Sequence, residues 1–546
     1  MQKPEIQKYW LYIIPILFLL YSAPASLDFV FHYPDEKYYT DAVLQMMEKG
    51  DYFTPYAADG SPRFLKPILT YWVLMGSYAI FGVSTFTSRL FFWLAGALLV
   101  AITFLMARSL TQNRKTAVIA AFITASNPLV LISAGRSIPD ILLTLFLTIS
   151  AWGFLEILVS AQPRKIYYWM AYLGAALAFE TKGFPAVAFA GASMLYLVFN
   201  PWKKINFRLI FEPFSMVVAV LLALSWFAVM YFIHGAVYFE SFFADQVGDR
   251  ISGKIVQAVG NASLGIVNLA AFLIPWIFIA LWKPADLKTQ IKDSDNTKKA
   301  LLGFIFLWVV LIIFMAGAVF KFYDRYVLPA IPLVAMFFAV VSSESKTGIK
   351  KGTISVLFVL NVIVLTINIF YGIFIDSTLL LILGTLFSFA VIVLYKAGAF
   401  RFAGQETIIA NGVMLLYFSA FVLLYPLLMP NPGKQLVETL HTQGIAEADK
   451  VYVYGNIRTA SNIRIHSNNQ MDVISMNNVF TLIETPAHFL VFDKKQQDSL
   501  NLSNYKVLKG SEEWSAVPVS KFPHFMQPAV QKLKTNGTSY LIAKPK

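Results

Sequence analysis

Long apolar runs separated by short polar segments fill the chain from its amino terminus to about residue 429. A helix needs about 17 to 25 mostly apolar residues to cross the hydrocarbon core of a bilayer, and roughly thirteen runs qualify. The predicted spans are residues 10–26, 86–107, 116–133, 138–159, 166–179, 184–199, 209–232, 266–282, 300–319, 326–341, 354–374, 379–395 and 408–428. The pattern predicts an α-helical polytopic membrane protein.

Two of these spans admit a second interpretation. Only residues 180–183 separate the fifth span from the sixth, so we predict a hairpin, with one long tilted helix as the alternative. The first span also resembles a secretory signal, because Lys3 and Lys8 precede the apolar stretch and a small-residue site at 23–25 follows it. We predict an uncleaved span.

The pattern changes after Pro430 to that of a soluble domain. Residues 434–442 have helical spacing, with Leu436, Val437 and Leu440 on one side and Gly444 as a stop. Strand-like runs follow at 451–454, 463–466, 472–476, 489–492, 505–508 and 540–543. We therefore predict a membrane domain at 1–429 and a soluble α/β domain at 430–546.

Composition supports a membrane protein. Hydrophobic residues make up 57% of the 546 residues and charged residues only 14%, against roughly 25% charged residues in a soluble chain. The chain has no cysteine, which excludes disulfides, thiolate metal sites and cysteine nucleophiles. Its net charge of +13 is scattered in short groups between apolar runs. This distribution indicates membrane topology and not a nucleic-acid partner.

Basic residues alternate between loops. Loops numbered as inside from the amino terminus carry about twice as many Lys and Arg residues as the outside loops. The positive-inside bias predicts a cytoplasmic amino terminus and, after an odd number of spans, a carboxyl-terminal domain on the outer face. The long loops 28–85 and 233–265 then lie outside. Residues 35–49 within the first loop predict an amphipathic juxtamembrane helix entered by Pro34.

Ionisable groups near membrane depth are costly and therefore mark functional sites by default. Those of this chain fall on the outer side and predict one polar cavity: Asp35, Glu36, Lys37, Arg63, Lys66, Arg136, Asp140, Glu180, Lys182, Asp245, Asp249, Arg250, Lys254, Lys321, Asp324 and Arg325. Asp35 and Glu36 have an alternative role as caps of the helix that they begin. No metal-binding histidine spacing, phosphate loop or Ser-His-Asp arrangement is present.

Residues 33–39, 50–55 and 64–72 closely resemble the first periplasmic loop of a family of bacterial membrane glycosyltransferases. This is the lipid A aminoarabinose transferase family of the GT-C type, related to the protein O-mannosyltransferases. The resemblance continues at 135–144, 180–183, 245–250 and 321–329. It implies a bacterial inner-membrane enzyme that transfers a sugar from a polyprenyl-phosphate donor to a lipid, glycan or protein acceptor.

The resemblance also implies roles for single residues. Asp35 matches the family's essential acid, Glu36 its companion and Tyr39 the tyrosine that follows. We predict Asp35 and Glu36 as catalytic residues. The predicted substrate-binding residues are Tyr39, Lys66, Asp140, Arg250, Lys321 and Arg325. Lys66 matches a lysine assigned to donor phosphate, Asp140 a fourth-span acid, and Arg250 an arginine of the second long loop. The family's metal-holding acid and histidine are replaced by Leu65 and by Gln246 with Val247. We therefore predict no metal and no other cofactor, and expect transfer to survive chelation. The alternative is a divalent-metal site built from Asp35, Glu36 and either Asp245 or Asp249.

The chemistry of such a transfer follows from the residue types. Cations stabilise a departing lipid phosphate, and Lys66, Arg250, Lys321 and Arg325 are candidates. A carboxylate takes the acceptor proton, and Asp35 is our choice. Direct displacement inverts the anomeric centre. The alternative is a transporter or flippase of a lipid-linked sugar, which predicts polar groups near the midplane; Glu156 lies nearer the inner end of its span.

Overall fold

The computed structural model describes most of the chain. The described residues are 6–27, 34–57, 60–244, 255–280, 284–344, 405–418, 432–445, 449–455, 457–476, 488–512, 519–521, 524–536 and 539–546, with the single positions 359, 362, 363, 366, 382 and 421. The predicted spans 354–374 and 379–395 lie almost entirely outside them.

Helices dominate up to residue 417. They are α1 (Ile6–Leu27), α2 (Pro34–Lys49), α3 (Leu69–Phe81), α4 (Thr85–Thr111), α5 (Arg114–Ala125), α6 (Pro128–Ala134), α7 (Pro139–Val159), α8 (Lys165–Lys182), α9 (Pro185–Phe199), α10 (Phe207–Ile210), α11 (Pro213–His234), α12 (Ala236–Phe243), α13 (Ile255–Phe272), α14 (Trp276–Ala280), α15 (Pro284–Asp293), α16 (Asn296–Ala318), the 3-10 helix η2 (Asp324–Ala330), α17 (Ile331–Glu344) and α20 (Gln405–Tyr417).

Within the described residues, 6 helices are long and apolar enough to cross a membrane, or up to 7 if the bent pair α5 and α6 forms one span. Shorter apolar helices cover Tyr9–Ser22, Leu69–Phe81 and Pro185–Phe199. The polytopic helical fold is thus confirmed, whereas the count of thirteen spans stays a prediction. The predicted third span is bent by 62° where Asn127 caps α6.

The hairpin at residues 180–183 is confirmed. Helix α8 ends at Lys182, Gly183 adopts a φ of +84°, and α9 begins at Pro185. Such a positive φ is easily reached by glycine and rarely by other residues. One long helix through this point is therefore excluded.

The predicted start of the eighth span at residue 266 is wrong. Helix α13 begins at Ile255, eleven positions earlier, and ends at Phe272. Polar and small residues in this segment led us to predict a loop, but in the structure they pack α13 against α16. Asn261 donates to the carbonyl of Val319 at 2.6 Å, and a Cβ at Gly265 would lie 3.3 Å from Ile313. Contacts with α16 thus hold a helix that local sequence does not favour.

A five-stranded sheet follows the helical part. It has the order β2-β1-β3-β5-β4, with β1 (Lys450–Tyr454), β2 (Asp472–Met476) and β3 (Phe489–Asp493) parallel. Strands β4 (Tyr505–Glu512) and β5 (Ser539–Pro545) are antiparallel, as is the β3–β5 pair. Helices α22 (Pro432–Thr442), α23 (Ile457–His466) and α24 (Gln527–Asn536) and the 3-10 helices η6 (Lys494–Ser499) and η7 (Val519–Lys521) complete the described part.

The predicted strand at 463–466 is wrong, because these residues belong to α23. Parallel strands need a crossover connection, and α23 supplies it between β1 and β2. The alternation of apolar residues at 463 and 465, which predicted a strand, arises because the two side chains pack into different cores. Ile463 packs into the core of the sheet, whereas Ile465 packs into the core of the helical bundle. Residues two apart on a helix point in nearly opposite directions, so a helix buried between two cores shows strand-like alternation.

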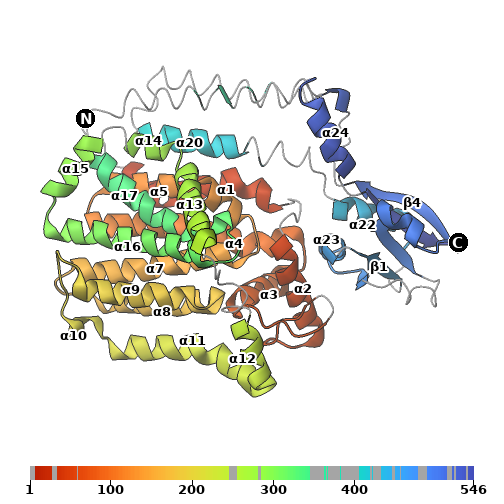
Figure 1. The fold of residues 1–546 in the computed structure, drawn as a ribbon, viewed down its shortest axis with the longest axis horizontal. Coiled ribbons are helices and arrows are strands. Elements are labelled where there is room, and N and C mark those ends of the chain that lie inside the picture. Colours follow the sequence, from red (N-terminus) through yellow and green to blue (C-terminus); the bar gives the residue numbers. More distant parts are fainter. Residues whose placement is uncertain are drawn as a thin grey trace.

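Helices α2, α3 and α12 gather at one end of the helical bundle, and the sheet lies beyond that same end (Figure 1). The predicted helix at 35–49 is confirmed as α2, with Pro34 in its first turn. The first-loop residues and the carboxyl-terminal domain are therefore neighbours. The periplasmic side of this end and the domain boundary at 429/430 stay predictions.

Candidate functional site

A cavity of about 320 Å³ opens between α7, α9, α16 and η2, near the end of the bundle that carries α2. Its walls are mostly apolar, with Leu143, Phe189, Ile312 and Met315 among them. Its charged lining is cationic: Lys66, Lys182 and Arg325. An apolar pocket with a few convergent polar groups is the usual form of a small-molecule site. The composition of this one suits an amphiphile with an anionic head.

Four charged side chains from four segments form a network beside this cavity. Nη2 of Arg325 lies 2.6 Å from Oδ2 of Asp35, and Nε of Arg325 lies 3.4 Å from Oδ2 of Asp140. Nζ of Lys182 lies 2.5 Å from the other Asp140 oxygen. The side chain of Asp35 is 37% exposed, whereas that of Asp140 is 4% exposed. Asp35 is therefore the carboxylate of this network that a substrate can reach.

Two opposing influences act on the pKa of Asp35. Burial raises it above the usual aspartate value, and the nearby Asp140 carboxylate raises it further. The cations of Lys182, Arg63 and Lys66 act in the opposite direction without cancelling the rise. A carboxylate with a raised pKa is a stronger base than an ordinary aspartate. The surroundings thus favour proton acceptance by Asp35.

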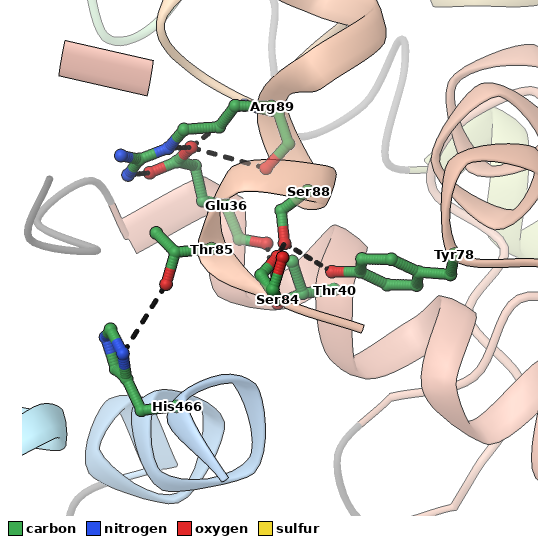
Figure 2. Close-up of polar contacts among 9 residues, drawn as sticks. Glu36, Thr40, Tyr78, Ser84, Thr85, Ser88, Arg89 and His466 are labelled. Carbon is green, nitrogen blue, oxygen red and sulfur yellow. Dashed lines mark hydrogen bonds and ion pairs between the residues drawn. The ribbon is translucent and has the colours of Figure 1, made fainter. Parts of the chain in front are cut away.

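Glu36 lies in a closed cluster. Arg89 donates to both Glu36 carboxylate oxygens, from Nε at 3.1 Å and from Nη2 at 3.0 Å, as Figure 2 shows. The backbone N–H of Ser137 donates to Oε1 at 2.9 Å. Both charged side chains are only 1% exposed. The structure thus separates Glu36 from Asp35, although the sequence placed them together.

Tyr39 and Arg63 lie near enough to Asp35 to interact with it electrostatically. Tyr39 is 4% exposed, and its ring centroid is 5.0 Å from that of Tyr71. The guanidinium of Arg63 lies 4.6 Å from the ring of Tyr38 and 5.7 Å from that of Tyr39. Among the described residues, Nη1 of Arg63 is buried and has no hydrogen-bond partner. Burial raises the pKa of Tyr39, which keeps its hydroxyl protonated.

The structure does not bring two of the predicted cations to the cavity, for different reasons. Lys321 is exposed and stands over the ring of Tyr323 at 5.4 Å, outside the cavity lining. Arg250, together with Asp245 and Asp249, lies outside the described residues. The roles assigned to Lys321 and Arg250 stay predictions.

The structure gives roles to two residues that the sequence analysis did not assign to catalysis or binding. Lys182 was predicted only as one member of the outer polar cavity; in the structure it lines the cavity and pairs with Asp140. Arg89 was missed although its position is unusual: it is a charged residue near one end of an apolar span. An ionisable side chain inside a predicted span is a signal in itself. Applied to every span, that signal would have found Arg89.

The structure offers no prepared metal site among the residues that it describes. No group of three or more His, Asp or Glu side chains gathers there in a way that could hold an ion. The acids at the cavity are instead paired with Arg325 and Lys182. The expectation that transfer needs no divalent metal stays a prediction, which treatment with EDTA tests.

The chain is similar to known membrane glycosyltransferases in sequence and in fold. Residues 65–232 match the family model described as dolichyl-phosphate-mannose-protein mannosyltransferase. An uncharacterised protein of Aquifex aeolicus is 28% identical over 364 residues, which cover 66% of this chain and 68% of that protein. The undecaprenyl phosphate-alpha-4-amino-4-deoxy-L-arabinose arabinosyl transferase of Yersinia pestis is 27% identical over 351 residues. That match covers 63% of this chain and 61% of the transferase.

The fold is shared with a solved transferase. The crystal structure of ArnT from Cupriavidus metallidurans in the apo state superposes with a TM-score of 0.73 at 14% identity, over 98% of both chains. The structure of the same protein bound to undecaprenyl phosphate gives a TM-score of 0.71, over 98% of this chain and 97% of that one. At this identity the similarity establishes the fold alone.

The family match over residues 65–232 and the similarity to arabinosyl transferases support the resemblance to membrane glycosyltransferases of the GT-C type. This type includes the aminoarabinose transferases and the O-mannosyltransferases. The resemblance found in the first-loop residues is thereby confirmed.

Proposed function

We propose that the protein is an integral-membrane glycosyltransferase that moves a sugar from a polyprenyl-phosphate donor to a lipid, glycan or protein acceptor. The observation that carries this proposal is the cavity itself. It joins apolar walls to Lys66, Lys182 and Arg325, beside the partly exposed carboxylate of Asp35. An apolar trough suits a prenyl chain and three cations suit its phosphate. The solved relative with the same fold was crystallised with undecaprenyl phosphate.

The reaction then proceeds as a direct displacement. The acceptor oxygen attacks the anomeric carbon, and its proton passes to the Asp35 carboxylate. The bond between the anomeric carbon and the phosphate oxygen breaks, and its electron pair leaves with the lipid phosphate. Lys66, Lys182 and Arg325 stabilise the charge that develops on that phosphate. One displacement inverts the anomeric centre and needs no covalent enzyme intermediate.

The burial of Glu36 and Asp140 supports different roles for them. Glu36 is held by Arg89 and Ser137 and is not open to a substrate. We therefore assign it to positioning the first turn of α2 and not to proton transfer. Asp140 holds Arg325 and Lys182 at the cavity and raises the pKa of Asp35. In this account the buried Tyr39 packs against Tyr71 and binds no donor phosphate directly.

We place the active site and the carboxyl-terminal domain on the periplasmic face of the bacterial inner membrane. The distribution of basic residues between loops supports this orientation. An alkaline phosphatase fusion after Pro430 should be active. An inactive fusion at that joint, combined with a fluorescent cytoplasmic reporter, would show that a span is miscounted.

The experiment that tests the function compares a deletion strain with its parent by mass spectrometry of envelope glycolipids and glycoproteins. We expect a glycan-bearing product to disappear and to return with the wild-type chain but not with Asp35→Asn. A flippase instead predicts loss of every product downstream of one lipid-linked sugar. It also predicts full complementation by Asp35→Asn, which would reject the proposed chemistry.

A further inference from the structure

Helix α23 of the carboxyl-terminal domain is buried on two sides. Ala460 and Ile463 pack into the core of the sheet, whereas Ile465 belongs to the core of the helical bundle and is 1% exposed. A domain that merely covered the bundle would not need to insert an apolar side chain into its core. The two domains therefore share an ordered interface.

The polar part of this interface is centred on Asp41, six residues after Asp35 on α2. Asp41 is 3% exposed. Oγ of Ser461 donates to its Oδ2 at 2.5 Å, and Nη1 of Arg464 donates to its Oδ1 at 3.2 Å. Burial raises the pKa of Asp41, while Arg464 and Ser461 act to lower it. A carboxylate as buried as this depends on such partners.

Arg464 also ties α2 to the sheet. Its Nε donates to the carbonyl of Val473 in β2 at 3.1 Å. The guanidinium of Arg464 therefore contacts both α2, which carries Asp35, and β2, which is an edge strand of the sheet. Because the guanidinium is planar and rigid, its two contacts fix each other's direction.

A second contact of α23 reaches α4, the helix whose Arg89 binds Glu36. His466 Nδ1 lies 3.5 Å from Oγ1 of Thr85, at the start of α4, and Figure 2 shows the pair close to Glu36 and Arg89. Helix α4 supplies the Arg89 that binds Glu36. Helix α23 thus touches both α2 and the helix to which the first turn of α2 is bound.

From these contacts we propose that the carboxyl-terminal domain takes part in sugar transfer by holding α2 where Asp35 faces the cavity, with Asp41, Ser461 and Arg464 as positioning residues. This proposal rests on the proposed function for its catalytic consequence. Asp35 stands in the first turn of α2, about 9 Å along the helix axis from Asp41. A small rotation of α2 would therefore move the Asp35 carboxylate, and a misplacement of about 1 Å can cost about 100-fold in rate.

The first test measures the position of α2 without any substrate. Spin labels are attached to two introduced cysteines, Glu48→Cys at the exposed end of α2 and Leu98→Cys at an exposed position of α4. Because the chain has no cysteine of its own, the labels attach nowhere else. The distance distribution between the labels should be narrow in the parent and broader or displaced with Arg464→Gln. Arg464→Lys keeps a hydrogen-bond donor for Asp41, so its distance distribution should lie between that of Arg464→Gln and that of the parent.

The second test separates positioning from folding. With Arg464→Gln, the envelope product should fall by about 10- to 100-fold. Binding of undecaprenyl phosphate in nanodiscs should stay within about twofold, since the cavity cations are untouched. Ser461→Ala is the milder variant should Arg464→Gln fail to fold. Asp472→Asn is the matched control, because it removes an exposed ion pair with Lys450 in the same domain. The charged atoms of that pair lie 3.7 Å apart, and neither residue belongs to α2 or α23.

A distance distribution identical to that of the parent in a folded Arg464 or Ser461 variant would overturn the proposal. An unchanged product yield in those variants would overturn it as well. If the parent itself forms no product, the proposed function fails, and the distance measurement still decides whether Arg464 positions α2.

Discussion

Asp35 and Glu36 are neighbours in sequence and opposites in structure. The side chain of Asp35 is 37% exposed and bonds a cation that lines the cavity, whereas that of Glu36 is 1% exposed and bonds Arg89, which is not part of the cavity lining. Consecutive residues on a helix point about 100° apart, so one carboxylate can face a site while the next faces the protein. An acidic pair in a sequence is therefore no guarantee of a catalytic pair.

The largest expected effect is at Asp35. Asp35→Asn removes the proposed base at nearly constant volume, and general base catalysis contributes about 10²- to 10⁴-fold. Transfer should fall by that factor at equal membrane abundance, measured by mass spectrometry of the product. Glu48→Gln, an exposed acid on the same helix, is the control and should keep full activity. Near-parental transfer by Asp35→Asn would show that Asp35 is not the general base.

The next effect concerns stability. Arg89→Met leaves the buried Glu36 carboxylate without its ion-pair partner, and breaking such a pair costs about 3–5 kcal/mol. We expect a lower unfolding temperature and a lower folded yield in detergent. The double variant Glu36→Gln with Arg89→Met should recover part of the loss, because neither charge is then left unpaired. A stable Arg89→Met protein that fails to transfer would instead assign chemistry to the closed cluster.

Smaller effects are expected among the cations. Lys66→Met should weaken binding of undecaprenyl phosphate by about tenfold or more, since hydrogen bonds to charged groups are worth about 1.5–3 kcal/mol. Lys321→Met should change it by no more than about twofold, because that side chain is exposed and outside the cavity lining. Isothermal titration in nanodiscs compares the two. Equal losses would show that the phosphate site extends to Lys321.

The smallest effect is a shift in the pH profile. Asp35 must be ionised to accept a proton, so transfer is retained above its pKa and lost as pH falls through it. Burial and Asp140 raise that pKa, so the acid limb should lie above the usual aspartate value of about 3.9. Asp140→Asn should move the limb to lower pH, and Lys66→Met should move it to higher pH. Shifts in the same direction for both variants would contradict the electrostatic account.

Much of the architecture could be predicted. Spans 86–107, 138–159 and 300–319 correspond to α4, α7 and α16, because apolar length is a local property. The helix at 35–49 and the strands at 451–454 and 489–492 were likewise predicted from local spacing and are confirmed. The two errors share one cause. Residues 255–265 and 463–466 take their structure from contacts with distant elements, which local pattern does not reveal.

The site was predicted in part. The sequence brought Asp35, Lys66, Asp140 and Arg325 together by resemblance and by their outer-side placement, and the structure gathers them at one cavity. The catalytic and binding roles of these residues stay predictions. Lys182 and Arg63 were placed in the predicted polar cavity but given no individual role, because a charge in a loop is most often a solvated one.

The sequence by itself determined the class of fold, a bundle of long apolar helices followed by a small α/β sheet, and it indicated a resemblance to membrane glycosyltransferases. These depend on apolar run length, composition and short motifs, all carried by neighbouring residues. Only the tertiary structure decided which partners the acids have. It gives Asp35 and Glu36 different environments, and it pairs Asp140 with Lys182 and Asp41 with Arg464. These pairings join residues from 42 to 423 positions apart, and what a carboxylate does depends on which distant cation folding brings to it.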